Sequence, residues 1–386
     1  MPSHYDIVIL GAGASGQMTA AGIGKRSSVL LLEGNSRPGA KISVSGGGRC
    51  NLCNLHLDSH RYRGDSHVLE TVFSRYDQHW LRRWFARRGV ETRSEKGGQL
   101  FCRSGAEEVN RALASACETV EFRGGWRIVS AEWREKGGFR ICNARGGCIE
   151  SRRLVVASGG LSFPKLGASD IGLRIAESLG HRVVRPAPAL VGWTLQPPQG
   201  FFRELSGVST EVEIRVGERR WRDRLLFAHR GLSGPAVLNA SLWWERGEVS
   251  VDFLPGFDLR GIRESRKQLT TLLPLPRRLV RALLEHLGVA DRPARILDRG
   301  TWERLERLHE YRFAPAGTFG YGKAEVTRGG VATDEIDPET MESRLVPGLY
   351  FVGEVLDVTG ELGGYNFQWA FSSAAVCADA LNREMA

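Results

Sequence analysis

The chain has 386 residues, of which 42% are hydrophobic and 25% charged, proportions typical of a globular protein with a full core and two or three domains. It contains no apolar run of the roughly 18 residues that a membrane span needs. The N-terminal MPSHYDIVIL also lacks the basic start and cleavage site of a secretory signal. These features exclude a membrane-spanning protein and predict a cytoplasmic one without a membrane partner.

The formal net charge of +9 raises the question of an anionic partner. Of the 53 basic residues only 7 are Lys, so 46 are Arg. Arginine is spread along the whole chain, and between residues 258 and 312 it is interspersed with Asp and Glu. This distribution favours a compositional bias of the genome over a nucleic-acid site. We therefore expect a small-molecule substrate rather than a nucleic acid.

The first segments in chain order predict a βαβ unit. The apolar run YDIVIL (5–10) predicts a buried parallel strand, and GAGASG (11–16) follows it directly. A helical stretch, TAAGIGKR (19–26), leads to a second strand, VLLLE (29–33). GAGASG matches G-x-G-x-x-G, whose glycines let a pyrophosphate reach the helix N-terminus. Glu33 is placed to accept hydrogen bonds from the adenosine ribose, which favours FAD or NAD over NADP.

Two helices are predicted next. Apolar residues recur at helical spacing from Ser66 to Arg88, and Gly89 is a plausible stop for that helix. A second helix is predicted from Ser104, where Glu107 completes a capping box.

Extended segments dominate the middle of the chain. Three strand-like runs predict a β-meander that returns to a buried strand: WRIVSAEW (126–133), FRICNA (139–144) and RRLVVAS (152–158). Strand-like runs over 193–253, such as EVEIRV and RWRDRLLF, predict a separate β domain. Residues 258–312 have the helical periodicity of a small insert, and a final helix is predicted from about Phe367.

Three later motifs decide between FAD and NAD. VVASGG (155–160) resembles the second nucleotide-contacting turn of two-domain flavoproteins. GLYFVGE (348–354) resembles the strand-plus-acid element that binds the flavin ribityl chain, with Glu354 where many such proteins have Asp. GELGGYNFQWAFSSA (360–374) places a Gly-Gly loop at a helix start, which suits the electron-rich N1/O2 edge of a flavin. Together they favour FAD.

The whole pattern resembles the YhiN/BaiN-type (HI0933-like) FAD-binding flavoprotein family, which also includes aminoacetone-oxidase-like enzymes. The resemblance rests on five motifs that span most of the chain: ILGAGASG (9–16), SGGGRCN (45–51), FAHRGLSGPAVL (227–238), GGVATDEIDPETMES (329–343) and GLYFVGEVLDVTGELGGYNFQWAF (348–371).

The resemblance implies an α/β fold with a Rossmann-like FAD-binding domain of the glutathione-reductase-like two-dinucleotide-binding type. We expect this discontinuous domain at residues 1–190 and 333–386. A β-barrel-like substrate domain is expected at 191–256 and 313–332, with a nested helical insert at 257–312.

The run SGGGRCNLCN (45–54) has two possible roles. Gly46, Gly47 and Gly48 would let the backbone pass against the cofactor. Alternatively, Cys50 and Cys53 could relay electrons beside the flavin as a dithiol. Family members tend to lack the second cysteine, so we favour the cradle and leave the relay as the alternative. Seven sparse cysteines are typical of a reducing compartment.

The motifs and the resemblance together give a set of candidate cofactor contacts and no metal site. The cofactor-binding candidates are Gly11, Gly13, Ala14, Ser15, Gly16, Glu33, Gly34, Lys41, Ser45, Gly47, Gly48, Arg49, Asn51, Val129, Ser158, Gly159, Gly353, Glu354, Gly364, Tyr365, Asn366 and Gln368.

Catalytic candidates are fewer. His229 is a candidate proton donor because an imidazole titrates near neutral pH, although a structural histidine explains it equally well. Tyr365 is the second candidate, on its motif position. Weaker candidates, each explained as readily by packing or solvation, are Tyr321, Lys323, Arg203 and Arg230.

The resemblance implies a FAD-dependent oxidoreductase that transfers hydride between flavin N5 and a small ketone, enone or amine. NADH, NADPH or O2 would be the other reactant. Two alternatives remain open: a tRNA-modifying flavoprotein, and a flavin-binding protein without turnover of its own.

Overall fold

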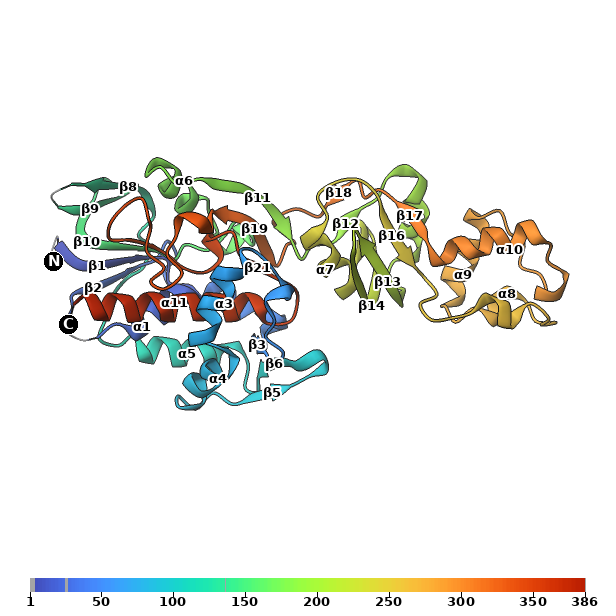
Figure 1. Ribbon diagram of the computed structural model, residues 1–386, viewed down its shortest axis with the longest axis horizontal. Coiled ribbons are helices and arrows are strands. Elements are labelled where there is room, and N and C mark those ends of the chain that lie inside the picture. Colours follow the sequence, from blue (N-terminus) through green and yellow to red (C-terminus); the bar gives the residue numbers. More distant parts are fainter. Residues whose placement is uncertain (1–3, 25–26, 136, 386) are drawn as a thin grey trace. The chain divides into compact units, whose positions relative to one another are not determined.

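The computed structural model describes residues 4–24, 27–135 and 137–385. The chain divides into two compact units, one of residues 1–188 and 325–386 and one of residues 189–324 (Figure 1). We refer to them as unit 1 and unit 2. No helix in the described ranges has the length and apolar character that a membrane span requires.

Unit 1 is organised around a mixed seven-stranded sheet in the order β7-β2-β1-β10-β9-β8, with β20 paired to β10. Strands β7, β2, β1, β10 and β20 are paired in parallel, whereas β9 is antiparallel to both of its neighbours, β10 and β8. Their bounds are β1 (His4–Leu10), β2 (Val29–Leu32), β7 (Glu121–Arg123), β8 (Ile128–Arg134), β9 (Gly138–Asn143), β10 (Cys148–Val156) and β20 (Leu349–Phe351). The expected Rossmann-like α/β fold with its β-meander is confirmed.

Further strands and seven helices belong to the described residues of unit 1. The strands are β3 (Asn51–Asn54), β4 (Tyr62–Arg63), β5 (Thr92–Ser94), β6 (Gln99–Cys102), β11 (Val183–Ala189), β19 (Val326–Val331) and β21 (Thr359–Gly360). The helices are α1 (Ala14–Gly22), α2 (Ala40–Val44), α3 (Ser66–Arg75), α4 (Gln78–Ala86), α5 (Ala106–Ala116), α6 (Ile171–Ser178) and α11 (Tyr365–Glu384).

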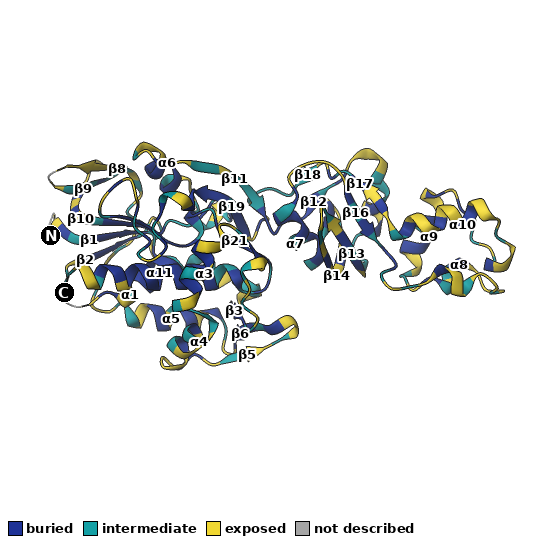
Figure 2. Ribbon diagram, viewed as in Figure 1, coloured by how far each residue is buried: buried dark blue, intermediate teal, exposed yellow. Residues whose placement is uncertain are grey.

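The core of unit 1 lies between the sheet and its helices. Strand β2 and the C-terminal residues of β1 and β10, 7–10 and 154–156, are buried (Figure 2). Helix α11 packs so closely on α1 that a Cβ at Gly22 would lie 2.7 Å from the Cβ of Ala378. A second hydrophobic cluster includes Cys50, Leu52 and Cys53 of the Gly-rich run. The apolar residues of the run are therefore held in a hydrophobic cluster, while its glycines remain partly or fully exposed.

Unit 2 joins a seven-stranded antiparallel sheet to a helical segment. The strands are β12 (Trp193–Thr194), β13 (Ser209–Val216), β14 (Arg219–Ala228), β15 (Gly231–Ser233), β16 (Val249–Asp252), β17 (Tyr311–Phe313) and β18 (Gly317–Thr318). The helices are α7 (Pro235–Trp243), α8 (Leu269–Leu272), α9 (Arg277–His286) and α10 (Arg299–Glu306). One hydrophobic cluster runs through both parts. The domain limits expected from the sequence stay a prediction, but residues 326–331 lie in unit 1 as β19.

Two predictions of local structure were wrong. The helix expected over 66–88 breaks at Tyr76, because Asp77 adopts an extended backbone and its carboxylate accepts a hydrogen bond from Trp80 N to start α4. The capping box expected at Ser104 does not form. Helix α5 starts after Gly105, whose φ of +93° favours glycine, and no side chain caps it.

Two further differences concern the ends of elements. The first helix starts earlier than expected, at Ala14, and ends at Gly22; Lys25 and Arg26, which we had included, lie outside the described residues. Cys142 and Cys148 form a disulfide across the paired strands β9 and β10, whereas reduced cysteines were expected. The other five cysteines, all within the described ranges, are free.

Candidate functional site

The turn after β1 depends on two close backbone approaches. Gly11 has a φ of +102°, and a Cβ there would lie 2.5 Å from the carbonyl oxygen of Ala157 at the end of β10. A Cβ at Gly16 would lie 1.8 Å from the carbonyl oxygen of Gly11. Both distances are shorter than any side chain permits. The two glycines therefore let the turn, the start of α1 and the end of β10 meet.

Gly13 serves the opposite purpose, because it faces open space. Its φ is −78°, which any residue can adopt, and an added Cβ would meet no protein atom within 4 Å. It precedes α1, and no side chain caps that helix. The first N–H groups of a helix have no intrahelical partner, and the helix dipole attracts an anion there. This geometry fits a pyrophosphate.

Glu33 lies directly beside this turn. Its Oε2 accepts a hydrogen bond from Ala12 N at 2.9 Å, and its Oε1 accepts one from Asn35 N at 2.9 Å. Each carboxylate oxygen retains a further lone pair, so the carboxylate can also accept hydrogen bonds from the ribose hydroxyl groups. The residues at 11–16 and 33 thus fit the adenosine diphosphate half of FAD. Gly34, the next candidate, is exposed at the same turn.

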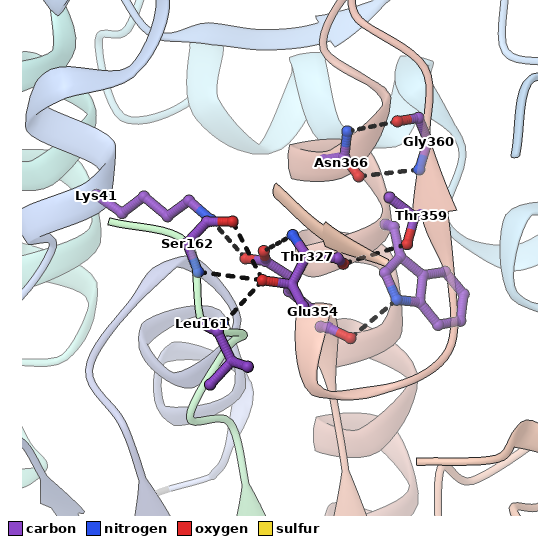
Figure 3. A network of polar contacts seen from close by, with 10 residues as sticks. Lys41, Leu161, Ser162, Thr327, Glu354, Thr359, Gly360 and Asn366 are labelled. Atoms are coloured by element: carbon purple, nitrogen blue, oxygen red, sulfur yellow. Dashed lines mark hydrogen bonds and ion pairs between the residues drawn. The ribbon is translucent and has the colours of Figure 1, made fainter. Parts of the chain in front are cut away.

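A polar network joins α2 to the segments after β10 and β20 (Figure 3). Lys41 Nζ lies 2.6 Å from Glu354 Oε2, and Glu354 Oε1 accepts a hydrogen bond from Thr327 N at 2.8 Å. Thr327 Oγ1 accepts hydrogen bonds from the backbone N–H groups of Leu161 at 2.8 Å and Ser162 at 3.1 Å. Both predicted residues, Lys41 and Glu354, are therefore brought together, and their charges offset each other.

Thr327, Leu161 and Ser162 were missed by the sequence analysis. Thr327 belongs to β19, where no motif marks it. The signal in the sequence that relates to Thr327 is Gly160 of VVASGG. In the structure a Cβ at Gly160 would lie 2.7 Å from Thr327 Oγ1, so only glycine leaves room for this hydroxyl. The glycines of VVASGG thus make room for a protein hydroxyl as well as for a ligand.

Two more of the predicted glycines lie around this network. Gly159 has a φ of +71° and lies beside Glu354, whereas a Cβ at Gly353 (φ +76°) would lie 2.6 Å from Ser15 Oγ. Ser158 Oγ is buried and has no hydrogen-bond partner within the described part of the chain. The turns after β1, β10 and β20 therefore converge at one end of the parallel strands.

The Gly-rich run folds into a tight loop. Gly46, Gly47 and Gly48 have φ values of +56°, +67° and +83°, which favour glycine at all three positions. Arg49 is exposed, and its guanidinium lies over the Phe101 ring at 4.2 Å while Nη1 pairs with Glu95 at 2.9 Å. Its side chain therefore stabilises the loop in this structure. Ser45 likewise donates its hydroxyl hydrogen to the Ile42 carbonyl at 2.8 Å.

Strand β3, which ends the Gly-rich run, contacts the Gly-Gly loop before α11. A Cβ at Gly364 would lie 2.4 Å from the Cys53 carbonyl oxygen, and Asn54 Nδ2 donates to the Gly363 carbonyl at 3.0 Å. Asn51 donates from Nδ2 to Gln99, but its Oδ1 is buried without a partner among the described residues. A buried acceptor left unpaired costs about 1–3 kcal/mol. This atom is therefore a suitable contact for a hydrogen-bond donor of FAD.

The buried thiols of the run favour the cradle over the dithiol relay. Burial raises the pKa of Cys50 to about 12, and it raises the pKa of Cys53 to about 12 as well. A thiol with so high a pKa is almost entirely protonated at neutral pH, and thiol–disulfide exchange requires the thiolate.

Three predicted residues at the start of α11 bond to the protein itself. Tyr365 is buried and donates its hydroxyl hydrogen to the His56 carbonyl at 3.2 Å. Asn366 bonds both the N–H and the carbonyl of Gly360, at 2.9 and 2.8 Å. Gln368 is buried and donates to Ser372 Oγ at 2.8 Å. These side chains shape the loop that would hold FAD, and burial also raises the pKa of Tyr365.

The remaining candidates are dispersed. Val129 lies on β8 with 46% of its surface exposed. His229 and Arg230 are exposed in the turn between β14 and β15 of unit 2, where the Arg230 guanidinium lies 5.2 Å from the Phe319 ring centre. Arg203 and Lys323 are exposed in unit 2, and Tyr321 is half-buried there. A catalytic role for His229 or Tyr365 stays a prediction.

Substituting Gly13 with Ala should weaken FAD binding without loosening the fold, because the new methyl group meets only open space. Gly11→Ala should lower the free energy of unfolding as well, since its Cβ collides with Ala157. Urea unfolding of the FAD-free proteins and FAD titration would separate the two effects, with Gly261→Ala as control because that position is also open. A Gly13→Ala protein that binds FAD normally would show that the turn does not face the cofactor.

Replacing Cys50 and Cys53 together with Ser should leave the rate of flavin reduction within about twofold, because neither thiol is ionised near neutral pH. Rapid anaerobic mixing with a reductant, monitored at the flavin absorbance, measures this rate. Loss of reduction in a variant that still binds FAD would instead establish the dithiol relay.

Comparison with known proteins agrees with this geometry. The family model described as "HI0933-like protein Rossmann domain" matches residues 5–380. The ribosomal RNA dihydrouridine synthase of Escherichia coli is 39% identical over 98% of both chains. The 3-dehydro-bile acid delta(4,6)-reductase of Clostridium scindens is 31% identical over 95% of this chain and 96% of the relative.

Among solved structures, a 3-ketosteroid-delta4-(5alpha)-dehydrogenase from Rhodococcus jostii RHA1 aligns with a TM-score of 0.56 over 98% of this chain and 97% of that chain. At 12% identity this likeness concerns the fold alone. The match to the family model, the two long relatives and the convergent glycine turns lead to one assignment. The chain belongs to the HI0933-like Rossmann family and is a FAD-binding flavoprotein oxidoreductase.

Proposed function

We propose that this flavoenzyme is a dihydrouridine synthase of ribosomal RNA, which reduces the C5–C6 double bond of a uridine. The observation that carries the proposal is the 39% identity to the Escherichia coli enzyme of that name over nearly the full length of both chains. The sequence favours a small-molecule substrate, with RNA modification, in the form of tRNA, as an alternative. The relatives favour that alternative, with ribosomal RNA as the target.

The chemistry of the two kinds of relative is related. A uridine C5–C6 double bond is conjugated to the C4 carbonyl, and a 3-dehydro steroid with delta(4,6) double bonds is also a conjugated ketone. In both, hydride adds to the carbon remote from the carbonyl, and a proton adds to the carbon beside it. The enone class expected from the sequence covers both substrates. A small enone is therefore the second candidate, supported by the 31% identical bile acid reductase.

The residues of unit 1 would hold and orient the cofactor. The first turn of α1 and Glu33 suit its pyrophosphate and ribose, and Asn51 with the Gly363–Gly364 loop suits its flavin end. Reduced FAD bound there would supply a hydride from flavin N5. The Lys41–Glu354 pair keeps α2 against the ribityl-binding element, so that the two ends of the site stay aligned.

We further propose that NADH or NADPH reduces the flavin as a transient reactant. The sequence contains no second G-x-G-x-x-G motif that would hold a nicotinamide dinucleotide permanently. Loss of the flavin absorbance when a nicotinamide is added under anaerobic conditions would support this electron source. It also separates an enzyme with turnover from a protein that only binds flavin.

The function is tested with ribosomal RNA from an Escherichia coli strain that lacks its own ribosomal RNA dihydrouridine synthase. The FAD-loaded protein and NADPH or NADH should convert a uridine of this RNA to dihydrouridine, detected by mass spectrometry as a gain of two hydrogen atoms. Transfer RNA from the same strain and a conjugated 3-dehydro-bile acid serve as competing substrates. Product on tRNA alone, or on the steroid alone, contradicts the proposal.

A further inference from the structure

The helical segment of unit 2 carries much of the positive charge of the chain. Residues 257–312 contain 13 basic and 8 acidic residues, a net charge of +5 out of +9 for the whole chain. From the sequence, the arginines interspersed with Asp and Glu between residues 258 and 312 favour a compositional bias of the genome over a nucleic-acid site.

Most of these acidic side chains bind either a backbone N–H group or a single arginine, so they do not neutralise the remaining cations. Asp258, Asp291 and Asp298 accept hydrogen bonds from the backbone N–H groups of Arg260, Thr270 and Thr301. Three glutamates form ion pairs with single arginines: Glu303 with Arg299, Glu306 with Arg263 and Glu310 with Arg312. Several other cations of the segment therefore have no acidic partner within 4.0 Å in the described structure.

Backbone pairing then gathers four of these cations. Arg295 N donates to the Ser265 carbonyl at 3.0 Å and Ala294 N donates to the Lys267 carbonyl at 3.1 Å, next to an antiparallel bridge between Gln268 and Pro293. Two loops that lie 25 or more residues apart in the sequence thus run side by side. They carry Arg266 and Lys267 on one strand of the pairing and Arg292 and Arg295 on the other.

We call Arg266, Lys267, Arg292 and Arg295 the basic loop pair. All four side chains are exposed, and none forms an ion pair with any described residue. The acidic residues of the same two loops are Glu264, which is exposed, and Asp291, whose second oxygen accepts the Thr270 hydroxyl hydrogen at 2.7 Å. Figure 2 shows the exposed residues around α8, α9 and α10 in this part of unit 2.

We propose that the basic loop pair binds the phosphate backbone of the substrate RNA, an inference that rests on the proposed function. Like charges held together by fixed backbone repel one another, and an anion that bridges them removes this cost. Arginine offers a planar set of donors that matches phosphate oxygens, and three of the four residues are arginine. Binding through several phosphates also releases counterions, which gives salt-dependent affinity.

The test compares the native protein with a variant in which all four residues are changed to Gln. Binding of a fluorescently labelled ribosomal RNA fragment is measured by anisotropy over a series of KCl concentrations. The variant should bind roughly tenfold or more weakly at about 0.1 M salt, and the slope of log Kd against log salt should fall by about 3. FAD content and flavin reduction by NADPH or NADH should be unchanged.

The matched control changes four arginines of unit 1 to Gln: Arg83, Arg87, Arg111 and Arg145. These are also exposed and have no ion pair among the described residues, so the net charge changes equally. If both variants lose RNA affinity equally, binding follows net charge and the inference is wrong. If the native protein binds RNA and the loop variant binds as tightly, the inference is wrong while the proposed function stands.

Failure of the proposed function would give a different result, because the native protein itself would then neither bind nor modify ribosomal RNA.

Ile296, which has 59% of its surface exposed, follows Arg295 of the basic loop pair and allows a lipid surface to be tested as the ligand. If the native protein binds vesicles of anionic lipid but not RNA, and Ile296→Ser abolishes that binding, the loops contact a lipid surface and the proposal is overturned.

Discussion

The site depends on one contact between two backbone turns. Gly11 lies so close to the Ala157 carbonyl that no side chain fits between the end of β1 and the end of β10. This approach is possible because the two strands are adjacent and parallel, because their C-terminal ends are buried, and because Gly11 tolerates a φ of +102°. It brings the helix N-terminus of α1 next to the second glycine turn and, through Ser15, next to Gly353. An extended dinucleotide can then cross the ends of several strands at once.

The sequence predicts the parts of the fold whose cause is local. The βαβ unit is visible because a buried strand, a glycine turn and a helix are adjacent in the chain. The break at Tyr76 is hidden, because apolar residues keep helical spacing across it while Asp77 starts a new helix through its own side chain. The Cys142–Cys148 disulfide depends on the register of β9 against β10, which composition does not reveal.

The candidate site shows the same limit for single side chains. A motif indicates which segment lies near a cofactor, and the segments at 11–16, 45–54, 158–160 and 353–366 do converge in unit 1. It does not indicate where each side chain points. Asn366 and Gln368 bond to the protein, and Thr327 enters the network from a strand without a motif. The same limit applies to charge. Arginines and acidic residues are interspersed in the sequence, but backbone pairing gathers the four cations of the basic loop pair, while several acidic side chains form ion pairs with other arginines.

The central claim is that backbone amides from four distant segments bind one extended FAD molecule. Hydrogen–deuterium exchange of the FAD-free and FAD-loaded proteins measures those amides directly. FAD should slow exchange together in residues 11–16, 45–51, 158–160 and 363–366, with no comparable change in α8, α9 and α10. Slower exchange confined to 11–16, or spread evenly over both units, would contradict the claim.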